Sequence, residues 1–587
     1  MTLTDELSLI VGEAFAAEGV DPSFGEVKVS DRPDLAQFQC NGALAAAKAT
    51  KSNPRALGEA VAARLKAEPS FAAVSIAGPG FINLTLTDAF LSERVNTLRA
   101  DGHAGGWRRI DGEKIVIDYG GPNIAKPLHV GHLRSAIIGE SLKRLLRFAG
   151  DDVTSDIHMG DWGLPMGQLI TEVAREKPDL PFFDPDYTGA YPSEPVVTLE
   201  DLERLYPQAS AACKADPVRA EEARRATAEL QSGRRGYRAL WEQFLAVSRA
   251  AIEREYADLD VTFDWWKGEA DADPLIDELA ADLRRQNLTE TSDGAEIIRV
   301  AREGDKKEIP PLILFKSDGS VLYGTTDLAT ILDRKRAIDP DRILYVVDQR
   351  QALHFEQVFR AADRAGVFPA DHLEHLGFGT MNGPDGKPFK TRAGGVLKLR
   401  DLIDMVETRA RERLVESGMA QGYGETEVAD IAHKVGVAAL KFADLSNPRT
   451  SDYIFDLDRF MAFEGKTGPY LLYASVRVKS VLAKALAAGA GEPGDIALEA
   501  PEEIGLALSL LAFGDAVRLA YEKRMPHFLC EHAFTLAQSF SKFYAACRIV
   551  DEADAARRAS RLALAEATGA QLDVVLGLLG IKIPARM

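Results

Sequence analysis

Residues 118–150 read DYGGPNIAKPLHVGHLRSAIIGESLKRLLRFAG, and they predict a strand end, a turn and a long helix in succession. The apolar run at residues 115–117 leads into them and indicates a buried strand of a parallel sheet. The glycines and proline at 120–122 end that strand. Helical spacing follows, and Gly150 is placed to cap the helix. The apolar stripe of this helix consists of Ile138, Leu142, Leu145, Leu146 and Ala149.

His129 and His132 stand where the predicted strand gives way to the helix, three residues apart. In an open parallel sheet ligands bind at the carboxyl ends of the strands, and a helix N-terminus attracts phosphate there. Both rings can face one ligand, and Gly131 between them lets a flat group approach the backbone. A nucleoside triphosphate fits this geometry. A lone H-x-G-H pattern is equally compatible with ordinary helix-start residues, so the neighbouring residues decide.

Residues 122–135, PNIAKPLHVGHLRS, closely resemble the HIGH-motif region of arginyl-tRNA synthetases, including the Asn123 and Lys126 that precede the histidines. The resemblance implies a class I synthetase with a Rossmann-like catalytic domain that uses ATP. It also implies roles for individual residues. We expect His129, Gly131 and His132 to bind ATP. We expect His129, His132 and Lys126 to act in catalysis. We expect arginine to contact Asp118, Asn123 and His129.

Residues 322–332, LYGTTDLATIL, predict a strand end, a turn and Asp327 at the opening of a helix. Alone, an acidic residue there often only caps the helix. Arginyl-tRNA synthetases carry a tyrosine and an aspartate at this spacing, so the resemblance implies that Tyr323 and Asp327 bind arginine. Glu269 matches a second carboxylate of the family, and Gln351 resembles a position that contacts arginine. Carboxylates suit this substrate because they accept paired hydrogen bonds from a planar guanidinium.

Residues 379–394, GTMNGPDGKPFKTRAG, stand where class I synthetases carry the KMSKS loop, which closes over the triphosphate. The sequence departs from that motif: it keeps two lysines but lacks the middle residues, so the register stays open. The resemblance implies ATP binding by Lys387, Lys390 and Arg392, with Lys390 also catalytic. The alternative is an ordinary basic, glycine-rich loop.

The length of 587 residues allows several domains, and three are expected. Residues 1–108 are similar to the N-terminal additional α+β domain of the family, which contacts tRNA, although a plain packing domain fits nearly as well. Residues 109–455 form the catalytic domain, with a helical insertion at about 172–260 whose dense charge is most simply a solvated face. Residues 456–587 predict a helical bundle, and the resemblance implies anticodon binding. The whole is a multidomain α/β protein.

Tyr470, Tyr473 and Arg477 in the C-terminal bundle have the side chains that stack on unpaired bases and hold phosphates. Core packing explains the tyrosines almost as well. The net charge of −19 argues against a nucleic-acid partner, because phosphate binding depends on lysine and arginine. A tRNA-binding surface in this protein must therefore be a local basic track.

The four cysteines lie far apart without a C-x-x-C pair, so we expect no protein-bound zinc and no disulfide framework. No stretch was expected to reach membrane-spanning length, and the N-terminus lacks a signal sequence. The expected protein is a cytoplasmic monomer without a membrane partner. Its expected partners are tRNA(Arg), L-arginine and ATP with Mg²⁺.

The expected reaction has two steps: arginine attacks the α-phosphorus of ATP, and the adenylate then passes arginine to tRNA. A small-molecule nucleotidyltransferase would share the H-x-G-H pattern, but it would not need 587 residues or a helical C-terminal domain. A synthetase-like RNA-binding protein without chemistry is the other alternative, and the intact His129, Gly131 and His132 argue against it.

Overall fold

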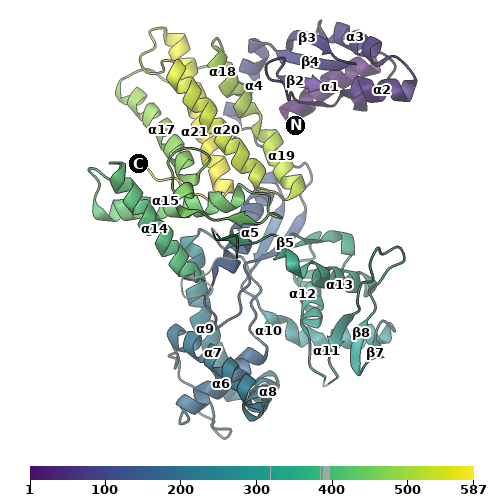
Figure 1. Cartoon of the computed structure of the whole chain (residues 1–587), viewed down its shortest axis with the longest axis vertical. Coiled ribbons are helices and arrows are strands. Elements are labelled where there is room, and N and C mark those ends of the chain that lie inside the picture. Colours follow the sequence, from purple (N-terminus) through teal and green to yellow (C-terminus); the bar gives the residue numbers. More distant parts are fainter. Residues whose placement is uncertain (318, 384, 388–396) are drawn as a thin grey trace. The chain divides into compact units, whose positions relative to one another are not determined.

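The computed structural model describes residues 1–317, 319–383, 385–387 and 397–587, and it divides into two compact units (Figure 1). We name them the central unit and the terminal unit. The central unit comprises Asp111–Arg413 and Ala443–Phe460. The terminal unit comprises Met1–Ile110, Leu414–Phe442 and Met461–Met587.

A parallel sheet lies at the heart of the central unit. Its strands are β5 (Lys114–Tyr119), β6 (Asp152–Asp156), β10 (Arg342–Val346) and β11 (Leu373–His375), in the spatial order β11-β10-β5-β6. Ile117 lies opposite Leu344 on one side and Ser155 on the other. The parallel sheet predicted from the apolar run at 115–117 is confirmed, and these three residues are fully buried. All four strands therefore present their carboxyl ends at one edge.

Helix α5 (Val130–Ala149) follows β5 and packs on it. The predicted apolar stripe is buried, and Gly150 ends the helix with φ of 108°, a conformation that favours glycine. Gly139 lets the helix approach β5 closely, because a Cβ there would lie 2.2 Å from Cγ of Tyr119. The helix is thereby fixed against the strand that precedes it.

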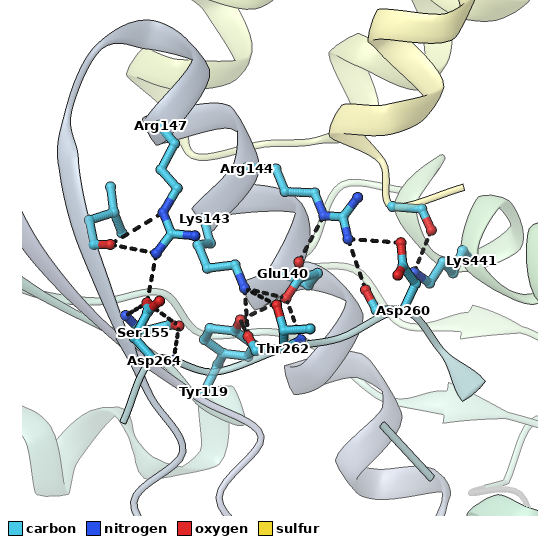
Figure 2. A network of polar contacts seen from close by, with 12 residues as sticks. Tyr119, Glu140, Lys143, Arg144, Arg147, Ser155, Asp260, Thr262, Asp264 and Lys441 are labelled. Atoms are coloured by element: carbon cyan, nitrogen blue, oxygen red, sulfur yellow. Dashed lines mark hydrogen bonds and ion pairs between the residues drawn. The ribbon is translucent and has the colours of Figure 1, made fainter. Parts of the chain in front are cut away.

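Buried polar contacts hold the middle of α5 as well (Figure 2). The Glu140 carboxylate pairs with Lys143 at 2.8 Å and with Arg144 at 2.7 Å, and it accepts a hydrogen bond from the Tyr119 hydroxyl at 2.9 Å. Burial raises the pKa of Glu140, but the charges of Lys143 and Arg144 outweigh it and leave the pKa below its ordinary value. Lys143 also donates to the Thr262 carbonyl. These contacts leave α5 little freedom to shift.

The remaining elements of the central unit surround the sheet. A hydrophobic cluster joins one sheet face, through Val116 and Ile343, to two helices, α12 (Tyr323–Ala337) and α13 (Ala352–Arg364). A second, antiparallel sheet has the order β7-β8-β9. The other elements here are β7 (Glu290–Ser292), β8 (Ala295–Ile298), β9 (Leu312–Phe315), α10 (Glu269–Ala272), α11 (Ile276–Arg285), β12 (Met381–Asn382), most of α14 (Leu399–Glu416), β13 (Tyr453–Ile454) and α16 (Leu457–Phe460).

The predicted insertion at about 172–260 is helical, as expected. Its helices are α6 (Leu164–Glu176), α7 (Leu199–Ala215), α8 (Pro217–Gln231) and α9 (Arg235–Asp258). Charged side chains cover much of it, but Leu202 and Leu205 of α7 are buried. The insertion therefore packs as part of the central unit.

The terminal unit begins with an antiparallel sheet of order β1-β2-β4-β3. The alternation predicted for residues 81–86 holds except at Asn83, which is buried and accepts a hydrogen bond from Gln39 at 2.7 Å. The elements are α1 (Leu3–Ala16), β1 (Val27–Val29), β2 (Phe38–Cys40), α2 (Gly42–Thr50), α3 (Pro54–Leu65), β3 (Phe71–Ala77), β4 (Phe81–Leu86) and α4 (Asp88–Ala100).

A bundle of helices completes the terminal unit, as the sequence predicted. It consists of most of α15 (Glu425–Leu445), α17 (Gly468–Ala487), α18 (Pro501–Leu511), α19 (Phe513–Lys523), α20 (His527–Ala546) and α21 (Ala555–Leu578). The first sheet and the bundle share this unit: Thr4 donates to Asp515 at 2.6 Å, and Arg99 pairs with Glu566 at 2.7 Å.

One segment of this bundle corrects the expectation that no stretch reaches membrane-spanning length. By length and composition alone, Pro501–Lys523 is long and apolar enough to cross a membrane, with a mean hydropathy of 1.5. In the structure it forms α18 and α19, which divide at Ala512 and pack within the bundle. Core helices of soluble proteins pass the same test.

Candidate active site

The two histidines form a hydrogen-bonded pair at the start of α5. His129 is the N-cap, and its Nδ1 accepts a hydrogen bond from the Gly131 N–H at 2.9 Å. The His129 N–H in turn donates to Nδ1 of His132 at 3.1 Å, and the ring centroids are 4.0 Å apart. With both Nδ1 atoms accepting, each neutral ring carries its proton on Nε2. Two N–H donors are therefore left for a ligand.

Burial keeps this pair uncharged. It lowers the pKa of His132 to about 3, with the neighbouring His129 adding to the effect. Burial, followed by the positive charge of Lys126, also lowers the pKa of His129. Neutral rings at a helix N-terminus donate hydrogen bonds to a phosphate without a change of protonation.

The structure shows why residue 131 must lack a side chain, and the reason lies within the protein. A Cβ at this position would lie 2.6 Å from Cε1 of His129 and 2.8 Å from its Nδ1. The flat group that approaches the Gly131 backbone is thus the His129 ring itself. Any side chain here would displace that ring.

Lys126 lies in the turn before the histidines, and its ammonium sits 4.7 Å from the centre of the Tyr206 ring. Tyr206 belongs to α7 of the insertion. The turn is fixed beside it, because the Ala125 N–H donates to the Ser248 hydroxyl of α9 at 3.1 Å. Asn123 is exposed, and its amide oxygen lies against Gly160, where a Cβ would come within 2.2 Å of it.

The residues expected to bind arginine lie on neighbouring helix starts. Tyr323 opens α12, Asp327 follows one turn later, and Glu269 opens α10. Tyr323 is 71% exposed, and partial desolvation together with the negative charges of Glu269 and Asp327 raises its pKa. Burial likewise raises the pKa of Glu269, to which Asp327 contributes. These mutual effects indicate one acidic group of side chains.

His354 pairs with Asp327 in this structure. Its Nε2 lies 2.5 Å from the Asp327 carboxylate, and that hydrogen bond raises the pKa of His354. The exposed Gln351 stands three residues earlier, at the N-cap of α13, and makes no capping hydrogen bond with its side chain. Asp327 thus faces an imidazole whose pKa it raises.

Asp118 has a different partner. Its carboxylate lies 2.5 Å from Arg334 of α12, which also pairs with Asp156 at the end of β6 at 2.7 Å. Arg334 and Asp156 are fully buried. Burial raises the pKa of Asp118, and the Arg334 charge opposes that rise. The triad joins the carboxyl ends of β5 and β6 to α12, the helix that also carries Tyr323 and Asp327.

The lysine-bearing loop is anchored beside the histidine pair. The Val130 N–H donates to the Leu397 carbonyl at 3.1 Å, and the Leu399 N–H donates to the Leu128 carbonyl at 2.9 Å. Lys398 therefore lies directly opposite His129. Lys387 is exposed, whereas Lys390 and Arg392 lie outside the described residues.

The other end of the loop is held through α5. Arg134 of α5 forms a buried ion pair with Asp444 at 2.9 Å and donates to the Ser451 carbonyl at 3.0 Å. Residues 449–454 in turn pair with the loop base, where β13 lies parallel to β12. Both ends of the loop are thus fixed, directly or through Arg134, to the helix that carries the histidines.

Sequence reasoning missed the contribution of α7. The dense charge of the insertion at about 172–260 is expected from the sequence to be a solvated face, and that expectation is wrong for Glu203. Glu203 pairs with Lys398 at 2.7 Å, and Tyr206 lies under Lys126. Their spacing of three residues places both on one helix face, which is the signal that could have found them.

The aromatic and basic residues of α17 are half-buried and contact protein groups. Arg477 donates to the Tyr473 hydroxyl at 2.6 Å and lies over its ring, while Tyr470 packs edge-on against Phe534. Across the described part of the chain, no cluster of three or more His, Cys, Asp or Glu side chains is arranged to hold a metal ion. The four cysteines are free.

Three family models match this chain. The model for the class I (R) tRNA synthetase catalytic domain matches residues 95–457, that for the arginyl-tRNA synthetase N-terminal domain matches 2–86, and that for the DALR anticodon-binding domain matches 471–587. The expected fold class, with its N-terminal, Rossmann-like and helical parts, is confirmed.

Curated relatives match over their whole length. The chain is 56% identical over 588 residues to the arginine–tRNA ligase of Hyphomonas neptunium and 55% identical over 587 residues to that of Maricaulis maris, with 100% of each chain covered. Among solved structures, the arginyl-tRNA synthetase of Plasmodium falciparum gives a TM-score of 0.82 at 24% identity, covering 100% of this chain and 99% of that one. That of Thermus thermophilus gives 0.79 at 22% identity, covering all of both. These structures support the fold.

One family model spans most of the chain, and both relatives are more than half identical to it throughout. This chain therefore belongs to the class I arginyl-tRNA synthetase family.

Proposed function

We propose that the protein is an arginine–tRNA ligase. It activates L-arginine with ATP to arginyl-adenylate, releases pyrophosphate, and transfers arginine to tRNA(Arg) with release of AMP. The observation that carries the proposal is the full-length identity of 56% to a curated arginine–tRNA ligase. The hydrogen-bonded histidine pair at the start of α5 supports it. The chemistry needs no covalent enzyme intermediate.

In the first step the arginine carboxylate attacks the α-phosphorus of ATP, and negative charge shifts to the pyrophosphate that leaves. Nε2–H of His129 and of His132 donate to phosphate oxygens, and Lys126 supplies a positive charge nearby. Gly131 supports this role by leaving room for the His129 ring. We assign Lys387, Lys390 and Arg392 of the loop to the triphosphate. Mg²⁺ enters as part of the ATP substrate.

Arginine is selected by charge and shape. The guanidinium of the bound arginine is surrounded by Tyr323, Glu269 and Asp327. The α-amino and carboxylate groups of the same arginine lie near Asn123, His129 and Gln351. Uncharged or shorter analogues would leave the carboxylates unpaired, so selection needs no editing step. Asp118 supports these residues through Arg334.

The remaining assignments complete the proposal. Residues 1–108 contact tRNA, residues 109–455 catalyse, and residues 456–587 bind the anticodon, with Tyr470, Tyr473 and Arg477 as weak candidates for base contact. To reach a base, Tyr473 and Arg477 would exchange their mutual contact for RNA. The protein acts as a monomer in the cytoplasm.

Pyrophosphate exchange tests this activity. We expect exchange that depends on arginine and ATP, and we expect it to be negligible until tRNA(Arg) is added, as the family's need for bound tRNA implies. Lysine and citrulline serve as control amino acids, since each lacks the guanidinium. Exchange driven equally by lysine would contradict the proposed substrate.

Lys126 and Lys390 supply charge to the leaving pyrophosphate in this account. We expect Lys126→Ala and Lys390→Ala each to lower kcat of adenylate formation by about tenfold or more, as loss of a charge contact in the transition state should. The KM for arginine should change little. The measurement is tRNA-dependent pyrophosphate exchange, with Lys267→Ala as control because that ammonium pairs with Asp333. A Lys126→Ala enzyme with unchanged kcat would remove this residue from the mechanism.

A further inference from the structure

Helix α7 contacts both chain segments that flank His129. On one side, Tyr206 places its ring 4.7 Å from the Lys126 ammonium in the turn before the histidine. On the other, Glu203 accepts a hydrogen bond from Lys398, the residue that pairs with His129 across the short antiparallel bridge. The two α7 residues are three apart and share one helix face.

Backbone hydrogen bonds fix residues 397–399 against the chain around His129. Leu397 accepts from the Val130 N–H, and Leu399 donates to the Leu128 carbonyl, so residues 397–399 bracket the histidine N-cap. Lys398 is exposed, whereas the Glu203 carboxylate is mostly buried, with 22% of its side chain exposed. A displacement of residue 398 would thus be transmitted to the backbone of His129.

A second carboxylate, that of Glu255, lies near the ion pair between Glu203 and Lys398. Glu255 of α9 lies near Lys398, Arg400, Glu203 and Asp258, and its Oε2 is buried without a hydrogen-bond partner in the described part of the chain. Burial raises the pKa of Glu255 to about 7, so near neutral pH it is only partly charged. Arg400 pairs with Asp258 and Asp404. Glu203 is therefore the carboxylate that holds Lys398.

We propose that α7 is a positioning element for adenylate formation, in which Glu203 fixes residues 397–399 and Tyr206 fixes Lys126 on either side of the histidine pair. Neither residue touches the reacting atoms. Each acts through a cation that borders the phosphate-binding N-terminus of α5. The inference rests on the proposed function, since it assigns a role within that reaction.

A double-mutant cycle tests the Glu203 contact. Glu203→Lys sets two ammonium groups against each other and should lower kcat of tRNA-dependent pyrophosphate exchange about tenfold, while Glu203→Gln should lose less because it still accepts a hydrogen bond. The KM for arginine should stay within about twofold. Lys398→Met removes the partner, so adding Glu203→Lys to it should cost nothing further.

Two substitutions of increasing severity test the role of Tyr206. Tyr206→Phe keeps the aromatic face for Lys126 and should retain kcat within about twofold. Tyr206→Ala should lower kcat about tenfold. Thermal unfolding of every variant, measured alongside, separates a positioning effect from a folding defect.

The matched control is Glu176→Lys. Glu176 forms a two-bond ion pair with Arg204, the α7 residue next to Glu203, but it belongs to α6. In the described part of the chain it has no hydrogen bond or ion pair to residues 397–399. Its kcat should equal that of the wild type. An inactive wild-type enzyme would count against the proposed function. An active wild type with Glu203→Lys kcat unchanged, or with multiplicative losses in the cycle, would overturn the positioning role.

Discussion

Asp327→Asn is expected to raise the KM for arginine on the order of a hundredfold and to leave the KM for ATP nearly unchanged. Asp327 stands in the acidic group with Glu269 and Tyr323, where its charge reaches both side chains. Removing one partner of a desolvated charge pair costs about 2–5 kcal/mol, and about 2.7 kcal/mol corresponds to a hundredfold. Initial-rate exchange assays at varied arginine and varied ATP measure the two constants.

His354 provides the comparison that makes this result specific. In the structure His354 pairs with Asp327 at 2.5 Å, so Asp327→Asn also removes the negative charge that faces His354. His354→Leu removes the hydrogen-bond donor while leaving the carboxylate for arginine, and it should therefore raise the KM much less. Equal effects of the two substitutions, or an equal rise in the KM for ATP, would show that Asp327 orders the protein and does not bind arginine.

Arg334→Leu is expected to destabilise the central unit by about 3–5 kcal/mol, because it leaves two buried carboxylates without their shared cation. Arg334 is the single guanidinium that pairs with both Asp118 and Asp156 in the structure as described. Chemical denaturation followed by tryptophan fluorescence measures the change in the free energy of unfolding.

Two variants sharpen this prediction. Arg336→Leu, two residues later in α12, breaks a two-bond pair with Glu278 at the surface and should change stability little, since exposed ion pairs contribute little. Adding Asp118→Asn and Asp156→Asn to Arg334→Leu should restore part of the loss, because the uncompensated charges are then gone. Stability of Arg334→Leu equal to that of Arg336→Leu would contradict the assigned role of the triad.

The parts of the site that the sequence predicted are those encoded by short-range spacing. His129, Gly131 and His132 are neighbours in the chain, and the strand, turn and helix that present them follow from local apolar periodicity and turn residues. The structure adds a reason for Gly131 that the sequence did not indicate, because a side chain at this position would meet the His129 ring. Tyr323 and Asp327 share one helix start for the same local reason.

The parts that the sequence could not predict depend on distant partners. Arg334 stands in the last turns of α12, where a basic residue has an ordinary role at a helix C-terminus, and its carboxylates are 216 and 178 residues away. Glu203 lies 195 residues from Lys398, within a stretch whose charge suggested only solvent exposure. A charged residue in such a stretch carries no local sign of which cation it will meet.

Aminoacylation of bulk tRNA, assayed separately with each of the standard amino acids, tests the central claim most directly. In the proposed function the paired histidines face ATP, and Glu269, Tyr323 and Asp327 select the amino-acid side chain. The account predicts that arginine alone is attached to tRNA, in a reaction that consumes ATP and forms AMP. Attachment of any other amino acid in preference to arginine, or no attachment of arginine at all, would contradict it.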